Sequence, residues 1–137
     1  INLAWSNDAF ELWILLHIKD ISNNHEEFKS RDKYYEFLSD YFSNHSNPNE
    51  RLQKVLSHPS FSYKKDLKHR TNFKEIVRSE ILIHTNTAIA RANKIFEFQK
   101  SKSKNYDDWC PCTLVHVLVT RLIAKGGKQL PSESKVN

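Results

Sequence analysis

The sequence predicts a mainly α-helical protein, with about five helices after one short N-terminal strand. Only two glycines occur in 137 residues, too few for hairpin-rich β folds or for Gly-rich phosphate loops. Apolar residues instead recur at spacings of three, four and seven, the spacings of one helix face. The hydrophobic content of 39%, with 12% aromatic residues, is enough for a buried core and excludes a chain disordered throughout. We expect one domain, residues 1–127, followed by a flexible tail, residues 128–137.

The chain opens with an apolar stretch that has no breaking residue, residues 1–5, and this stretch predicts the strand. A first helix follows, and the three-residue spacing of Asp8 and Glu11 is that of a capping box at its N-terminus. Apolar side chains then occupy almost every face of this helix. Such a helix is expected to be buried on more than one side.

The middle of the chain predicts two shorter helices. One spans residues 30–43 with Ser30 as its N-cap, because Tyr34, Phe37, Leu38 and Tyr41 follow helical spacing. The next begins with Asn47 as its cap and a proline in its first turn, and ends near Ser57. Residues 58–71 predict a basic loop that contains aromatic residues.

The C-terminal half predicts the longest helix, residues 72–100. Weak helix formers at residues 85–87 mark a bend or a break in it. After a polar loop, the last helix is expected to begin near Cys112 and Thr113 and to stop at Gly126.

The charge is distributed unevenly along the chain, although its total is only +5. Residues 1–60 carry six basic and nine acidic side chains, whereas residues 61–137 carry fifteen and seven. This asymmetry favours a basic face that binds nucleic acid, and a merely solvated lysine-rich surface is the alternative. Cations close to an aromatic ring suit phosphate contacts and base stacking. The candidate nucleic-acid-binding residues are Lys64, Lys65, Lys68, Arg70 and Arg91.

Glu11 is the carboxylate most deeply embedded in apolar sequence, and two interpretations of it remain open. The first is capping of the first helix together with Asp8. The second is a catalytic carboxylate or metal ligand at the junction of strand and helix. Because Mg²⁺ needs several oxygen ligands, the second interpretation requires partners from elsewhere in the protein.

Two thiols and three histidines are weaker candidates. Cys110, Cys112 and His116 have the spacing of soft metal ligands, but a structural zinc site needs a fourth ligand. We favour two small buried residues there over a metal site, or over a Cys112 nucleophile activated at a helix N-terminus. For His17 and His84 we favour hydrogen-bonded core positions over metal ligation.

Four segments, taken in order, resemble the RloB family, which includes the second component of the AbiL abortive-infection system. Residues 6–18 stand in the frame of the family motif S-N-P-C-F-E-x-W-x-L-L-H-F. Residues 63–65, 88–92 and 110–119 are similar to its Y-x-K, A-x-x-R-A and N-P-S-T-x-V-H-x-L-V elements. The matching motif positions are Ser6, Asn7, Phe10, Glu11, Trp13, His17, Thr113 and His116. The chain departs from the motifs at residues 8–9, which replace Pro-Cys, and at its two cysteines, which replace Asn and Ser.

The resemblance implies the helical C-terminal portion of a Toprim-like α/β protein of bacterial phage defence. Relatives of this kind are expected to bind divalent metal, Mg²⁺, through two acidic motifs near their N-terminus. This chain contains neither motif, and we expect it to begin just after the second one. Glu11 is then an extra acid beside the metal, and Lys65 or Arg91 a phosphate contact.

Two functional hypotheses follow. The first is a metal-dependent nuclease when complete, with this chain inactive by itself. The second is a non-catalytic helical module that binds nucleic acid or a partner ATPase. No apolar run reaches about 18 residues and no signal peptide is evident, so we expect a cytoplasmic protein that does not insert into a membrane.

Overall fold

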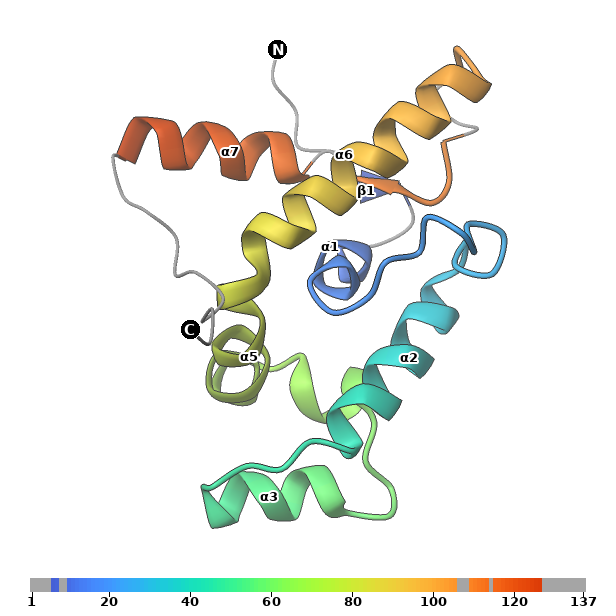
Figure 1. The fold of residues 1–137 in the computed structure, drawn as a ribbon. Helices are drawn as coiled ribbons and strands as arrows, with labels where there is room; N and C mark the ends of the chain where they lie inside the picture. The colour runs from blue at the N-terminus through green and yellow to red at the C-terminus, as the bar shows by residue number, and fades with distance from the viewer. Residues whose placement is uncertain (1–5, 8–9, 106–108, 114, 127–137) are drawn as a thin grey trace, which may run out of the picture.

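The computed structural model describes residues 6–7, 10–105, 109–113 and 115–126, with the backbone alone at residues 6–7. The described chain is mainly helical, and the predicted fold class is confirmed (Figure 1). The strand expected at residues 1–5 and the tail expected at residues 128–137 lie outside the described residues. In the part of the chain that is described, no helix is long and apolar enough to cross a membrane.

Helix α1, Glu11–Leu16, lies at the centre of the fold, and all six of its residues are buried (Figure 1). It contacts α2, Arg31–Ser43, and α6, Thr85–Lys102. Burial on more than one side is therefore confirmed. The predicted capping box is wrong, because the helix starts at Glu11 itself with Phe10 as an N-cap that makes no side-chain hydrogen bond. Asp8 lies outside the described residues.

Helix α2 confirms the sequence prediction closely. The Ser30 hydroxyl accepts a hydrogen bond from the backbone N–H of Lys33 at 3.3 Å, as an N-cap does. Tyr34, Leu38 and Phe42 recur every four residues and are fully buried against the core. The amphipathic pattern therefore places one face of α2 against α1.

Helix α3, Glu50–Ser57, ends where the sequence predicts, but its cap is displaced. The side chain of Asn49, not that of Asn47, accepts the hydrogen bond from the backbone N–H of Leu52, at 3.2 Å. Asn47 instead accepts from the backbone N–H of Asn49 at 2.9 Å. Both residues are good caps, so composition alone did not distinguish them.

The predicted basic loop is partly helical, which corrects the sequence analysis. A π-helical turn, η1, spans Tyr63–Leu67 and buries its two end residues. Ser62 caps this turn: its hydroxyl accepts from the backbone N–H of Lys65, and its own N–H donates to the Asp66 carboxylate. Two side-chain caps and two buried apolar residues explain why this stretch does not remain a loop.

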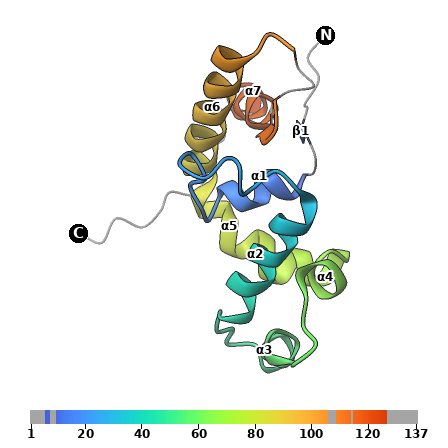
Figure 2. The same ribbon diagram turned by 90° about the vertical axis from the view of Figure 1, so that its right-hand side faces the viewer.

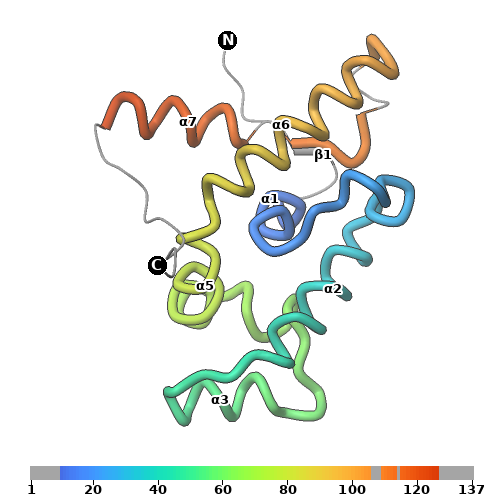
Figure 3. The backbone as a smooth tube through the Cα atoms, in the orientation of Figure 1, coloured from blue at the N-terminus to red at the C-terminus, as the bar shows by residue number. Residues whose placement is uncertain are grey.

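Helical backbone then runs from Arg70 to Lys102, two residues further at each end than predicted. Its elements are α4 (Arg70–Asn72), the π-helical η2 (Phe73–Arg78), α5 (Ser79–Ile81), the 3₁₀ turn η3 (Leu82–His84) and α6. The chain changes direction between α5 and α6, at η3 (Figure 3). The bend therefore lies at Leu82–His84, directly before the predicted position, because residues 85–87 themselves form the first turn of α6.

The last predicted helix start is wrong. Cys112 and Thr113 form a strand, β2, that pairs antiparallel with β1, Ser6–Asn7. Helix α7, Val115–Gly126, begins only after this pairing and packs against α6 (Figure 2). The partner strand lies at the other end of the sequence, so local pattern favoured a helix where a non-local contact makes a strand.

Candidate nucleic-acid interface

Glu11 and Lys68 contact each other, although the sequence predicted them on separate grounds. The Lys68 ammonium lies 2.9 Å from Glu11 Oε1 and donates a hydrogen bond to the Tyr35 hydroxyl at 2.8 Å. The Tyr35 hydroxyl lies 3.4 Å from the same Glu11 oxygen. The Glu11 side chain is only 10% exposed, so Lys68 supplies the counter-charge that this buried carboxylate needs.

The electrostatics of this cluster agree with its geometry. The hydrogen bonds to Tyr35 and then to Glu11 raise the pKa of Lys68 above its ordinary value. Tyr63, which is buried beside them, has its pKa raised first by burial and then by the negative charge of Glu11. The cluster therefore holds a charged pair next to a neutral phenol.

The divalent metal that the resemblance implies does not fit this arrangement. The Glu11 carboxylate is paired with a lysine, and Mg²⁺ requires several oxygen ligands. Within the described ranges, no three His, Cys, Asp or Glu side chains lie close enough together to hold a metal ion. We therefore derive no catalytic step from Glu11.

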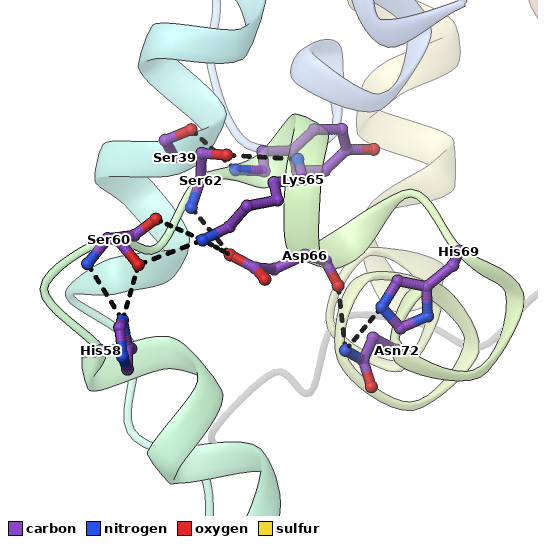
Figure 4. A network of polar contacts seen from close by, with 9 residues as sticks. Ser39, His58, Ser60, Ser62, Lys65, Asp66, His69 and Asn72 are labelled. Atoms are coloured by element: carbon purple, nitrogen blue, oxygen red, sulfur yellow. Dashed lines mark hydrogen bonds and ion pairs between the residues drawn. The ribbon is translucent and has the colours of Figure 1, made fainter.

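Lys65 is held by its neighbours in a polar network (Figure 4). Its ammonium donates to the carbonyl of Ser60 at 2.7 Å and lies 3.5 Å from an Asp66 carboxylate oxygen. Lys64 differs, because it is exposed, lies over the Tyr35 ring at 5.7 Å and forms no ion pair with any described residue. Of these two candidates, Lys64 is the one whose charge is uncompensated.

Arg70 begins a stripe of three exposed cations that the sequence analysis recognised only in part. Arg70, Lys74 and Arg78 are four residues apart on continuous helical backbone, which places them on one face. None of them forms an ion pair with the residues that the structure describes, and the nearby Glu75 is paired with Arg51 at 2.7 Å. We call Arg70, Lys74 and Arg78 the basic stripe.

Lys74 and Arg78 were missed for a definite reason. The sequence predicts the long helix from residue 72 and a loop at Arg70, so the three cations do not stand out as one series with four-residue spacing. The spacing itself is the signal that would have found them.

Arg91 has a structural contact at the other end of α1 from Lys68. Its Nη1 donates to the carbonyl oxygen of Leu16 at 2.9 Å, and the side chain is half-buried. A cation at the C-terminus of a helix satisfies a free carbonyl and interacts favourably with the helix dipole. This contact accounts for Arg91 without a phosphate.

The segment that matches the first family motif packs into the core. His17 Nδ1 donates to the carbonyl oxygen of Trp13 at 2.9 Å, and its Nε2 lies 3.2 Å from the Thr85 hydroxyl. Burial lowers the pKa of His17 to about 4. The interpretation of His17 as a hydrogen-bonded core histidine is therefore confirmed.

The first and last motifs meet in space, although they lie at opposite ends of the chain. Ser6 pairs with Thr113 and Asn7 with Cys112 in the β1–β2 ladder. Cys112 is buried, and burial raises the pKa of its thiol to about 12, which opposes the activated nucleophile considered above. His116 is buried too, with its ring 6.3 Å from that of Phe96.

Fold and surface together define a mainly helical protein with an ion-paired acid at its centre and a stripe of cations that have no ion pair in the described part of the chain. Comparison with protein families gives one match, the RloB-like protein family, over residues 1–122. The chain belongs to this family. No curated protein and no solved structure matches it.

Proposed function

We propose that this chain is the nucleic-acid-binding helical part of a cytoplasmic, RloB-like phage-defence protein of bacteria. The observation that carries the proposal is the basic stripe, three exposed cations without an ion pair in the described structure. Its members recur every four residues along one continuous helical stretch, so they follow one another along the same face. A nucleic-acid strand carries one phosphate per nucleotide, so a row of cations can contact several phosphates of one strand.

Lys64 extends this surface, whereas Lys65, Lys68 and Arg91 support it indirectly. Lys65 pairs with Asp66, Lys68 pairs with Glu11, and Arg91 donates to the last carbonyl of α1. These contacts hold η1 and α1 in place. Metal-dependent cleavage remains a proposal for a longer protein, with acidic ligands from outside the described residues. The described residues are proposed to bind nucleic acid without cleaving it.

Neutralising the basic stripe is expected to weaken nucleic-acid binding about tenfold or more. The change is the triple variant Arg70→Gln, Lys74→Gln and Arg78→Gln, which removes three phosphate contacts. Affinity for a fluorescent single-stranded oligonucleotide at low salt, measured by anisotropy, checks this. The matched control neutralises three exposed lysines that already have carboxylate partners, Lys29, Lys54 and Lys102. Equal losses in the two triple variants would mean that net charge, not the stripe, governs binding.

A protein partner is a second candidate, and helix α7 favours it. This helix is mostly apolar, yet His116 is the one residue of it that is buried. Val117, Leu118 and Leu122 are exposed, the last of them at 59%. The partner ATPase that the resemblance implies is the protein to test on this face.

Leu122→Asp is expected to abolish co-purification with an ATPase encoded beside this protein. Its free energy of unfolding should change by no more than about 0.5 kcal/mol, because the side chain is exposed. Thr120→Asp, a polar exposed position on the same helix, is the control. Unchanged co-purification of the Leu122 variant would exclude α7 as the docking face.

A further inference from the structure

A small pocket opens where α1, the η2–η3 segment and α7 meet. Its volume is about 260 Å³, and its lining includes three aromatic side chains, Phe10, Trp13 and Phe73. His17 and Thr85, hydrogen-bonded to each other, add polar atoms, and Arg78 adds a cation. Among the residues that the structure describes, the lining contains no acidic side chain.

We propose that this pocket takes one unstacked base of a single-stranded nucleic acid, while Arg78 contacts the phosphate of that nucleotide. The inference rests on the proposed function, because Arg78 is also the last member of the basic stripe. A strand that follows the stripe from Arg70 therefore arrives at the mouth of the pocket.

The pocket is suited to a base in its chemistry and its size. Aromatic side chains stack on the flat faces of bases, and Phe10 offers such a ring to solvent, since it is 53% exposed. Pockets for drug-sized ligands measure roughly 300–1,000 Å³, so about 260 Å³ suits something smaller, such as one planar ring system. A base in a duplex is stacked and paired, so the pocket selects single strands.

An apolar side chain of a protein partner is the competing occupant, because Leu82 and Val119 also line the pocket. The base is favoured by the combination of aromatic walls with Arg78, which forms no ion pair with any residue that the structure describes and continues a row of cations. A purely apolar occupant would leave Arg78 without a function at this position.

The test compares two eight-nucleotide strands, oligothymidylate and an abasic strand of the same length, on the full chain. Both carry the same phosphates, so a difference in affinity reports the bases. We expect oligothymidylate to bind at least about fivefold more tightly, which is the lower end of the effect of stacking one base. Phe10→Ala should remove this preference and leave the affinity for the abasic strand unchanged. Arg78→Gln should lower the affinity for both strands.

Phe98→Ala is the matched control, because Phe98 is also exposed, at 42%, and lies on α6 away from the pocket lining. Equal affinity of the two strands would contradict base binding in the pocket, and so would an equal preference for oligothymidylate in the Phe10 and Phe98 variants. Either result would favour an apolar protein side chain as the occupant. The phosphate-binding stripe would survive that result. If neither strand binds, the proposed function and the pocket fail together.

Discussion

Acidification from pH 6.5 to pH 4 is expected to lower the free energy of unfolding by on the order of 3 kcal/mol through His17 alone. Burial lowers the pKa of this histidine from 6.5 to about 4 in the folded protein. Between these two values the unfolded chain binds a proton at residue 17 that the folded chain does not bind. Lower pH therefore favours unfolding, and the stability is fully present only above about pH 6.5.

Two more histidines act in the same direction. Burial lowers the pKa of His25 and of His116, so both add to the loss of stability in acid. Both have one buried ring nitrogen without a hydrogen-bond partner in the described structure. Burial lowers the pKa of His17 as far as about 4, so we expect His17 to be the largest single contributor.

The measurement is urea unfolding of the wild type and His17→Gln at pH 6.5 and pH 4.5. The variant is expected to be less stable at the higher pH, because it disturbs the contacts to Trp13 and Thr85, but to depend less on pH. His58→Gln, at an exposed position, is the control, and its free energy of unfolding should depend on pH as that of the wild type does. A His17 variant with the full wild-type dependence would show that another group causes the acid instability.

Lys68→Ala is expected to lower the free energy of unfolding by about 2 kcal/mol at pH 7, because it leaves the Glu11 carboxylate buried without its cation. The larger cost known for fully buried pairs is reduced here, since the lysine itself is 44% exposed. The pKa of Lys68 is raised in the folded protein. The contribution of the pair is therefore fully present below the ordinary lysine pKa and lost as the pH rises through the raised one.

A double-mutant cycle with Glu11→Gln isolates the pair. Once the carboxylate is neutral, loss of the lysine should lower the free energy of unfolding much less. The loss of stability in the double variant is therefore expected to be smaller than the sum of the losses in the two single variants. Lys64→Ala is the matched control, because Lys64 also lies over Tyr35 but forms no ion pair among the described residues. Additive effects at the two positions would mean that Glu11 and Lys68 are not coupled in solution.

Local pattern was sufficient where an element is built from neighbouring residues. The Ser30 cap and the four-residue repeat of Tyr34, Leu38 and Phe42 define α2 within its own sequence. The burial of α1 followed from the apolar residues on all its faces.

Local pattern failed where the contacts come from distant residues. Cys112 and Thr113 form a strand because Ser6 and Asn7 lie beside them, and no nearby residue announces that pairing. The start of the helical stretch at Arg70 depends on the capped turn η1 before it, which sequence spacing did not reveal.

The candidate site shows the same division. Apolar context singled out Glu11, but its partners Tyr35 and Lys68 come from α2 and the end of η1. The sequence left helix capping and a metal or catalytic role open for Glu11, and in the structure its carboxylate pairs with Lys68. The basic surface was correctly expected in residues 61–137. Only the structure distinguishes its exposed cations that have no ion pair among the described residues from those that are ion-paired.

The most direct test of the nucleic-acid interface is the salt dependence of single-stranded oligonucleotide binding, for the wild type and the Arg70, Lys74 and Arg78 triple variant. Each phosphate contact in a single strand contributes about 0.7 to the slope of log affinity against log salt concentration. Three contacts predict that the wild-type slope is steeper than that of the triple variant by about 2. Equal slopes would contradict the assignment of the basic stripe as the nucleic-acid-binding surface.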